Sequence, residues 1–301
     1  MKVFVAGGTG TIGLPLVRAL VGAGHQVTAL TRSPGKRLEL QALGAIAAVA
    51  DALDRDALAD AVRAARPTHV VHQLTALPPG GPRRARDLEA TNRLRIEGTR
   101  HLLDAAIRAG ARRFVAGSFA PLTADGASAS PGDEAAAAAR SMEQQVLDAA
   151  RRGAIEGIVL RYGLFYGLEA PSTQAMIEMV RRRRLPIVGG DAGQLPIIHV
   201  ADAVSATVRA LDAGRSGAAY SIVDDCAVSL AEIVQAIATY TGSPSPMKVP
   251  AWVPRLVAPY MARVTSIRMP LSNALAKVEL GWRPAYPTLG DGLAQMFRKA
   301  A

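Results

Sequence analysis

The chain of 301 residues is poor in cysteine, in aromatic side chains and in long apolar runs. Its single cysteine, Cys226, cannot form an internal disulfide and belongs to no metal-ligand pattern, which predicts a protein of a reducing compartment without zinc. We expect Cys226 to be buried as a small apolar residue. No apolar run is long enough for a membrane span. The first strand-like segment begins at residue 3, which leaves no targeting peptide ahead of it and predicts a cytoplasmic protein.

Lysine is also scarce, although the net charge is +10. A basic surface can attract nucleic acid or an anionic membrane. Only five of the 35 basic residues are lysine, however, and the arginines accompany a high alanine content, which indicates a compositional bias. The run 181–184 follows an apolar helical pattern, where cations favour the C-terminal end of the helix dipole. We therefore expect a small-molecule substrate and neither a nucleic-acid nor a membrane partner.

Glycine is plentiful, and its placement near the N-terminus is the most informative motif. An apolar segment, 3–6, leads into Gly7, Gly10 and Gly13, and an apolar helical pattern follows. In a doubly wound α/β fold the first of these glycines permits a tight turn and the second lets the backbone approach a pyrophosphate. The third allows close packing of helix and strand. The helix N-terminus adds amide donors and positive potential. This context predicts a dinucleotide site.

Strand-like and helix-like segments alternate through the first half with short connections, a pattern typical of a parallel sheet. The predicted strands are 3–6, 26–31, 46–49, 69–73, 113–117 and 155–161, and the predicted helices are 12–23, 37–43, 54–65, 86–109 and 134–152. The sequence thus predicts a Rossmann-type doubly wound parallel sheet. We interpret 121–133 as a mobile loop.

Beyond residue 165 the alternation weakens and prolines become frequent. We therefore predict a dinucleotide-binding core over 1–165. Residues 166–301 mainly form a smaller substrate lobe, with some elements returning to the core.

Several further segments resemble, in order, those of the extended short-chain dehydrogenase/reductase superfamily, in particular its NAD-dependent epimerase/dehydratase-like branch. They are the glycine motif 7–13, Asp51, the segment 70–76, Asn92 with 97–106, and the segments 160–167, 197–204 and 279–284. The resemblance covers essentially the whole chain. It implies a nicotinamide dinucleotide as cofactor and a homodimer formed through the helices near 86–109 and 134–152.

The resemblance also implies which residues contact the cofactor. Asp51 occupies the family's position beside the adenine, the segment 70–76 passes the cofactor after the fourth strand, and 160–167 leaves the sixth strand beside the nicotinamide. The implied set is Gly7, Gly10, Thr11, Ile12, Gly13, Arg32, Ser33, Asp51, Ala52, Gln73, Leu74, Thr75, Asn92, Tyr162 and Leu164.

The end of the second strand indicates which nicotinamide cofactor is preferred. An acidic residue there binds the ribose hydroxyls of NAD, whereas a cation accommodates the 2′-phosphate of NADP. This chain has Thr31 and Arg32 at that point, followed by Ser33, Lys36 and Arg37. We therefore predict NADP(H) as the preferred cofactor, with NAD(H) as the alternative. The alternative for Arg32 itself is that it is an ordinary solvated arginine of the loop.

The catalytic pair of the family has no counterpart here. In the family, a tyrosine four residues before a lysine acts as general acid and base near the start of the helix after the 121–133 loop. Aligning Glu143 with that helix places Ala135 and Ala139 at these positions, and residues 100–161 contain neither tyrosine nor lysine. The family's hydroxyl residue after the fifth strand falls on Ser118 or Phe119, and Phe119 is the preferred register.

Another group must then donate protons if the protein is an enzyme that needs one. The candidates are Tyr162, Tyr166 and Ser118, with His72 and His199 as weaker ones. An aromatic residue at the positions of the two tyrosines is more often part of the pocket wall. His199 fits as a cap of the following helix together with Asp202, and His72 fits as a core residue.

The functional hypothesis is an atypical NADP(H)-dependent oxidoreductase that acts on a small metabolite. A substrate with an activated alkene, imine or quinone can take its proton from water, because the cofactor carries the hydride step. One alternative is a catalytically silent, NADP-sensing regulatory or scaffold protein. A second is an isomerase or dehydratase that uses bound cofactor transiently.

Overall fold

The computed structural model describes residues 1–78, 81–123, 133–188, 193–250, 252 and 271–298. Its elements, in chain order, are β1 (Lys2–Ala6), α1 (Gly13–Gly22), β2 (Gln26–Thr31), η1 (Pro34–Lys36), α2 (Arg37–Ala42), β3 (Ile46–Val49), α3 (Arg55–Ala65), β4 (His69–His72), η2 (Ala85–Leu88), α4 (Glu89–Arg93), η3 (Leu94–Gly98), α5 (Thr99–Arg108), β5 (Arg113–Phe119), α6 (Ala120–Thr123), α7 (Glu134–Arg151), β6 (Glu156–Tyr162), β7 (Leu164–Tyr166), α8 (Pro171–Arg181), β8 (Ile187–Val188), β9 (Ile197–His199), α9 (Val200–Ala213), β10 (Ala219–Ile222), α10 (Leu230–Tyr240), β11 (Lys248–Val249), α13 (Ala274–Glu279) and α14 (Leu289–Arg298).

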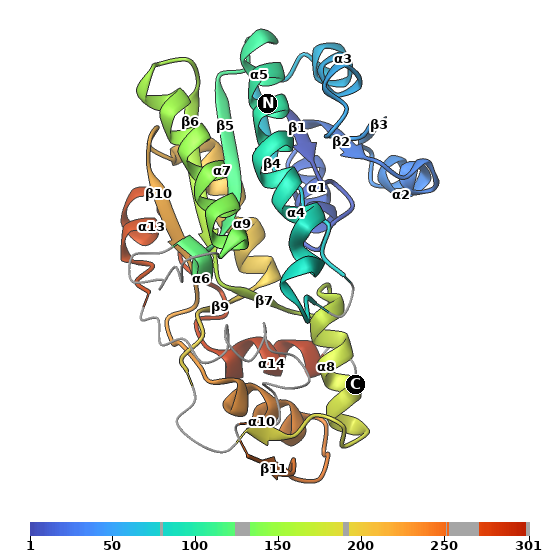
Figure 1. Ribbon diagram of the computed structural model, residues 1–301, viewed down its shortest axis with the longest axis vertical. Coiled ribbons are helices and arrows are strands. Elements are labelled where there is room, and N and C mark those ends of the chain that lie inside the picture. The colour runs from blue at the N-terminus through green and yellow to red at the C-terminus, as the bar shows by residue number, and fades with distance from the viewer. Residues whose placement is uncertain (79–80, 124–132, 189–192, 251, 253–270, 299–301) are drawn as a thin grey trace.

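A seven-stranded parallel sheet forms the centre of the molecule, in the order β10-β6-β5-β4-β1-β2-β3 (Figure 1). The order reverses at β1, the point at which open α/β sheets bind ligands. The predicted Rossmann-type sheet is confirmed. The sequence analysis found six of the strands, and β10, which pairs with β6, is the seventh.

The predicted helix 86–109 is the largest departure among the elements. The segment begins as the 3₁₀ turn η2, continues as α4, passes through the π-helical turn η3 and ends as α5. A π turn holds one residue more than an α turn, so it changes the direction of the side chains that precede it. Arg95 lies within this turn, and its exposed fraction is 7%.

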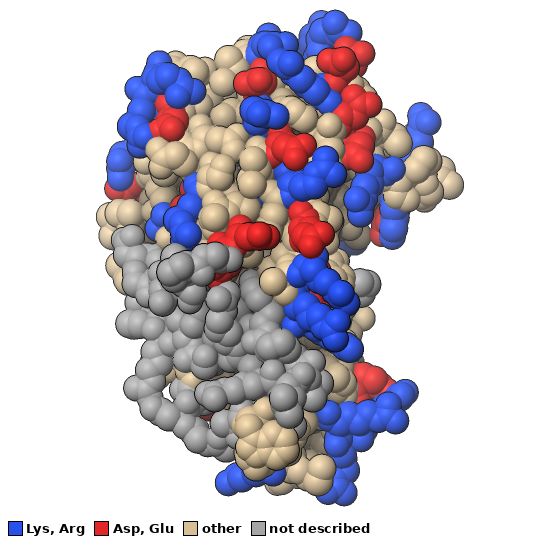
Figure 2. All heavy atoms as spheres, viewed as in Figure 1, with Lys and Arg blue, Asp and Glu red and all other residues tan. Residues whose placement is uncertain are grey.

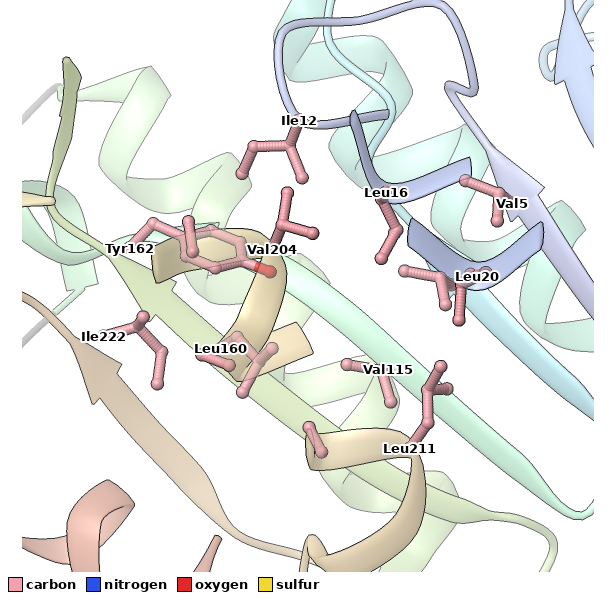
Figure 3. Close-up of a cluster of buried hydrophobic side chains, with 14 of the residues drawn as sticks. Val5, Ile12, Leu16, Leu20, Val115, Leu160, Tyr162, Val204, Leu211 and Ile222 are labelled. Atoms are coloured by element: carbon pink, nitrogen blue, oxygen red, sulfur yellow. The ribbon is translucent and has the colours of Figure 1, made fainter. Parts of the chain in front are cut away.

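Helices cover both faces of the sheet, as the alternating side chains of buried parallel strands require. One face packs on α1 and α9, and the other on α3, α5 and α7. Val5 points to the first face and Phe4 to the second, and both are buried. Figure 3 shows the first cluster, in which Tyr162 of β6 lies beside Val204 of α9.

A smaller lobe lies beyond the carboxyl end of the sheet (Figure 1). It contains α8, α10 and α14, which share a third apolar cluster, and the small sheet of β8 and β11. The pair β7 and β9 lies between this lobe and the main sheet. The division at residue 165 stays a prediction.

Two local predictions concern the burial of Cys226 and the loop 121–133. Cys226 is exposed, so its predicted burial was wrong: the residue follows β10 in a loop, after the chain has left the sheet. Most of the predicted 121–133 loop lies outside the described residues.

On the face shown in Figure 2, basic and acidic side chains alternate over the sheet domain instead of forming one basic surface.

Candidate functional site

The glycine loop has the geometry of a close backbone turn. Gly7 has φ of +88°, and a Cβ there would lie 2.6 Å from the carbonyl oxygen of Gln73. A Cβ on Gly13 would overlap the carbonyl of Gly7, which in turn accepts a hydrogen bond of 3.0 Å from the amide of Gly10. Gly10 itself is exposed. The loop therefore offers accessible backbone at the start of α1, as a phosphate cradle requires.

The ends of β2 and β3 lie side by side, because Thr31 pairs with Val49. Arg32 is exposed immediately after β2, and the side chain of Asp51 accepts a hydrogen bond of 2.9 Å from the amide of Leu53. This arrangement places a cation and a carboxylate at one edge of the sheet, beside the strand that leads into the glycine loop.

The segment after β4 enters the site between β1 and β5. Gln73 donates its side-chain amide to the phenol oxygen of Tyr162 at 2.9 Å, and that oxygen lies 2.7 Å from the hydroxyl of Thr207. Gly117 makes this possible, because a Cβ there would overlap the side chain of Gln73. Burial raises the pKa of Tyr162 to about 12. Leu74 is half-buried and Thr75 is exposed.

Tyr166 ends β7 with a buried phenol. Its hydroxyl donates to a carboxylate oxygen of Asp224 at 2.9 Å. Burial first, and then the charge of Asp224, raise the pKa of Tyr166 far above its ordinary value. Burial also raises the pKa of Asp224 to about 8. The nearby ring of His199 accepts a hydrogen bond of 3.2 Å from the amide of Ala201, so it caps α9 as predicted. Asp202 takes no part in this cap, because its carboxylate accepts from the amides of Ala285 and Tyr286.

Ser118 and Phe119 end β5. Ser118 is paired in register with Arg161, and its exposed fraction is 6%. Its hydroxyl has no hydrogen-bond partner among the described residues. Phe119 is half-buried and packs against a small apolar cluster that includes Ala135 and Ala139.

Methyl groups occupy the first two turns of α7. Asp133 caps the helix by accepting from the amide of Ala136 at 3.1 Å, and Ala135 and Ala139 are buried. Glu143, two turns into the helix, forms a buried ion pair with Arg161 of β6, with 2.7 Å between Oε2 and Nη2. The helix is therefore fixed on the sheet with no group for proton transfer at positions 135 and 139.

Opposite this start of α7 lie Asn92 and Arg95. Arg95 Nη1 donates to the carbonyl oxygen of Ala135 at 3.4 Å. Asn92 Oδ1 is buried and has no partner among the described residues. Burial lowers the pKa of His72 to about 4, and the charge of Arg95 acts in the same direction. His72 is fully buried, and its Nε2 lies 2.8 Å from the hydroxyl of Thr99, as a core residue requires.

Sequence reasoning missed Arg95 and the buried state of Asp224. Arg95 lies close to the exposed Arg93 in the sequence, and no sequence pattern indicates which of the two arginines is buried. Its only signal is its spacing of three residues from Asn92, which puts both on neighbouring parts of one helical surface.

The glycine loop, the parallel sheet and the reversal of strand order at β1 together define a dinucleotide-binding protein of the Rossmann type. The chain belongs to the NAD dependent epimerase/dehydratase family, whose model matches residues 3–223. It is thus an extended short-chain dehydrogenase/reductase, and its cofactor is a nicotinamide dinucleotide. In the described part of the chain, no helix is long and apolar enough to cross a membrane.

The 3-diazoavenalumate denitrifying reductase of Streptomyces sp. is 38% identical to this chain, over 98% of it and 100% of the reductase. A 4-hydroxy-2-methyl-3-oxo-4-farnesyl-3,4-dihydroquinoline-1-oxide ketoreductase of Stigmatella aurantiaca is 29% identical, over 76% of this chain and 70% of its own. These names and the family support an oxidoreductase.

Solved structures agree on the fold. A double mutant of the dTDP-glucose 4,6-dehydratase DesIV of Streptomyces venezuelae, solved with NAD, superposes with a TM-score of 0.81. The sequence identity is 22%, and the match covers 99% of this chain and 96% of the dehydratase.

Proposed function

We propose that the protein is an NADP(H)-dependent reductase that transfers hydride to a small aromatic diazo compound with loss of N₂. The observation that carries the proposal is the burial of Ala135 and Ala139, to which the sequence analysis assigns the positions of the family's proton-transferring tyrosine and lysine. The similarity over full length to a reductase named for a diazo substrate supports it.

The glycine loop fits the cofactor, because its backbone is packed so closely that a Cβ at Gly7 or Gly13 would overlap a neighbouring carbonyl group. In this proposal Gly7, Gly10, Thr11, Ile12 and Gly13 hold the pyrophosphate. Arg32 with Ser33 binds the 2′-phosphate of NADP through a charge-assisted contact. The adenine lies near Asp51 and Ala52. The segment Gln73, Leu74 and Thr75, together with Asn92, Tyr162 and Leu164, lines the path to the nicotinamide.

Proton balance explains why this chemistry suits the site. The nicotinamide supplies a hydride, and reduction of a ketone to an alcohol needs a proton as well. An arenediazonium cation and a hydride ion together give the arene and N₂, with the C–N bond broken and the cofactor oxidised. No net proton is consumed, so a site without an acid residue loses nothing in this reaction.

The three candidate proton donors differ in how they fit this proposal. The phenols of Tyr162 and Tyr166 are buried and already hydrogen-bonded, and their raised pKa values make them weak acids. They act as pocket wall and as fixed supports. Ser118 has a buried hydroxyl without a partner among the described residues, and we assign it to hydrogen bonding with the substrate.

The test uses 3-diazo-4-hydroxycinnamate, prepared with ¹⁵N nitrite, and NADPH. We expect one labelled N₂ and one 4-hydroxycinnamate for each NADPH oxidised, measured by mass spectrometry and absorbance against an enzyme-free reaction. Aryl ketones should react at least about a hundredfold more slowly, since a general acid contributes a factor of about 10²–10⁴.

Two glycines of α1 provide matched variants. Gly13→Ala should abolish NADPH binding because its Cβ overlaps Gly7, whereas Gly22→Ala meets nothing within 4 Å and should retain activity. NADPH binding that depends on Gly13 without turnover of either substrate class would contradict the proposal and favour a cofactor sensor. Redox-neutral conversion of a substrate would favour the isomerase or dehydratase alternative.

The small-molecule substrate is part of the same proposal. Homodimerisation through 86–109 and 134–152 and a cytoplasmic location stay predictions that depend on the sequence and the resemblance.

A further inference from the structure

Phe119 is an aromatic side chain at the end of β5, in a chain that has few of them. The resemblance aligns it with a hydroxyl residue of the family, and Ala135 and Ala139 with the tyrosine and the lysine. In the structure all three belong to one small apolar cluster, to which Leu88 and Leu122 also contribute. The three apolar residues therefore contact a shared set of neighbours and form an apolar surface with one aromatic ring.

The strand pairing places Phe119 at the carboxyl edge of the sheet. β4 pairs with β5 as far as His72 and Ala116. β5 continues for three more residues beside β6, until Phe119 pairs with Tyr162. Open α/β sheets bind their ligands at this edge. Phe119 is half-buried, so part of its side chain remains accessible.

Contacts of Gln73 connect this edge to the glycine loop. A Cβ at Gly7 would lie 2.6 Å from the carbonyl oxygen of Gln73, so the two backbones are close together. The side-chain amide of Gln73 donates to the phenol oxygen of Tyr162 at 2.9 Å, and Tyr162 is the register partner of Phe119. A cofactor that runs from the glycine loop past Gln73 and Tyr162, as in the proposed function, brings its nicotinamide end toward Phe119.

We propose that Phe119 selects the aromatic ring of the substrate by packing against it beside the nicotinamide. The inference rests on the proposed function for the identity of the reaction. Aromatic pairs are favourable beyond the area that they bury, and their preferred geometries fix the ring in place. The side chains of Phe119, Ala135 and Ala139 offer no hydrogen bonds, which a sugar needs for the hydroxyl groups that it removes from water. This surface therefore favours an arene.

The test compares 3-phenylpropanoate with 3-cyclohexylpropanoate, two acids with an aromatic and a saturated ring. Binding to the NADP⁺ complex is measured by calorimetry, which needs no turnover. Wild-type protein should bind the phenyl acid about three- to tenfold more tightly, the range of an aromatic pair. Phe119→Leu keeps an apolar side chain and should bind the two acids within about twofold of each other. Its affinity for NADP⁺ should stay within about twofold of the wild type.

Phe297→Leu is the matched control, because it removes another half-buried phenylalanine ring, which stacks on Tyr240 in the lobe. It should keep the wild-type preference for the phenyl acid. Phe119→Tyr retains an aromatic ring and should keep the preference as well. If Phe119→Leu fails to fold, Phe119→Met provides a flexible apolar side chain that adapts to its neighbours, and it should lose the preference.

Equal binding of the two acids by the wild type would overturn the inference, as would a folded Phe119→Leu protein that still prefers the phenyl acid. A loss of NADP⁺ affinity in Phe119→Leu would also overturn it, because Phe119 would then support the cofactor. An inert diazo substrate, together with a ring preference that depends on Phe119, would contradict only the proposed reaction. Release of N₂ without that ring preference would contradict only the role of Phe119.

Discussion

Arg32 is the residue on which the choice between NADP and NAD depends. It is exposed at the end of β2, beside the end of β3. If it binds the 2′-phosphate, Arg32→Ala should weaken NADPH binding about tenfold, since a charge-assisted hydrogen bond contributes about 1.5–3 kcal/mol and an exposed one lies at the low end. NADH binding should change little. Fluorescence titration with both nucleotides measures the difference.

Arg18→Ala is the control for Arg32, because it removes an exposed arginine from α1. Equal weakening of NADPH and NADH by Arg32→Ala would assign Arg32 to general electrostatic attraction, and no change in either would remove it from the site.

Arg32 and Arg95 differ in how far the sequence alone predicts their positions. Arg32 follows a clearly bounded strand, so its position at the end of β2 could be predicted. Arg95 lies in the π turn and its guanidinium contacts the start of α7, and its sequence position indicates neither feature. Local pattern therefore predicted where Arg32 lies and missed the buried cation opposite Ala135.

At the scale of elements, the position of α7 depends on the ion pair between Glu143 and Arg161, whose side chains are 5% and 20% exposed. Glu143→Gln leaves the guanidinium of Arg161 without its counter-charge in a largely buried place. We expect a loss of about 2–4 kcal/mol in the free energy of unfolding, measured by urea denaturation.

The exposed pair of Arg93 and Glu97 provides the comparison for α7. Glu97→Gln should lower the free energy of unfolding far less than Glu143→Gln does, because surface pairs on helices contribute little. Equal losses for the two variants would show that Glu143 does not anchor the helix.

Strands were more predictable than helix interiors. β2 and β3 have the predicted bounds, because short apolar runs in this chain stand between clear turn residues. A helical pattern of 3.6 residues predicts 86–109 as one helix, and it contains no signal for the extra residue of η3. β10 was missed because its four residues form a strand only by pairing with β6.

At the scale of the whole molecule, Asp224 connects the sheet to the lobe through Tyr166, whose hydroxyl also contacts the carbonyl of Thr288 just before α14. Burial raises the pKa of Asp224 from 3.8 to about 8. Between these values the folded state retains a proton that the unfolded chain releases. The free energy of unfolding should therefore fall with rising pH, by up to ~1.4 kcal/mol for each pH unit.

Asp224→Asn keeps an acceptor for Tyr166 and removes the titration. Thermal or urea denaturation between pH 6.5 and 8 should show a flatter pH dependence for this variant than for the wild type. His72 has an ordinary pKa of 6.5 that is lowered to about 4, so it adds a slope of the opposite sign near pH 6.5, which is the same in the wild type and in Asp224→Asn and cancels in their comparison.

Asp225→Asn is the matched control, since Asp225 is an exposed neighbour whose pKa is lowered: burial raises it, but the hydrogen bonds from Asn273 and Lys277 and nearby positive charges together outweigh burial. It should leave the slope between pH 6.5 and 8 unchanged. A wild-type slope that Asp224→Asn does not alter would mean that the carboxyl is ionised throughout.

Because β10 returns to the main sheet, the sheet domain and the lobe are not formed by two separate stretches of the chain. After β6 the chain enters the lobe with α8, comes back with α9 and β10, and leaves again with α10. A single cut near residue 165 would strip α9 from one face of the sheet and uncover the apolar surface that it protects. The core and the lobe are thus interleaved, and neither can be inherited or exchanged as one continuous piece of gene.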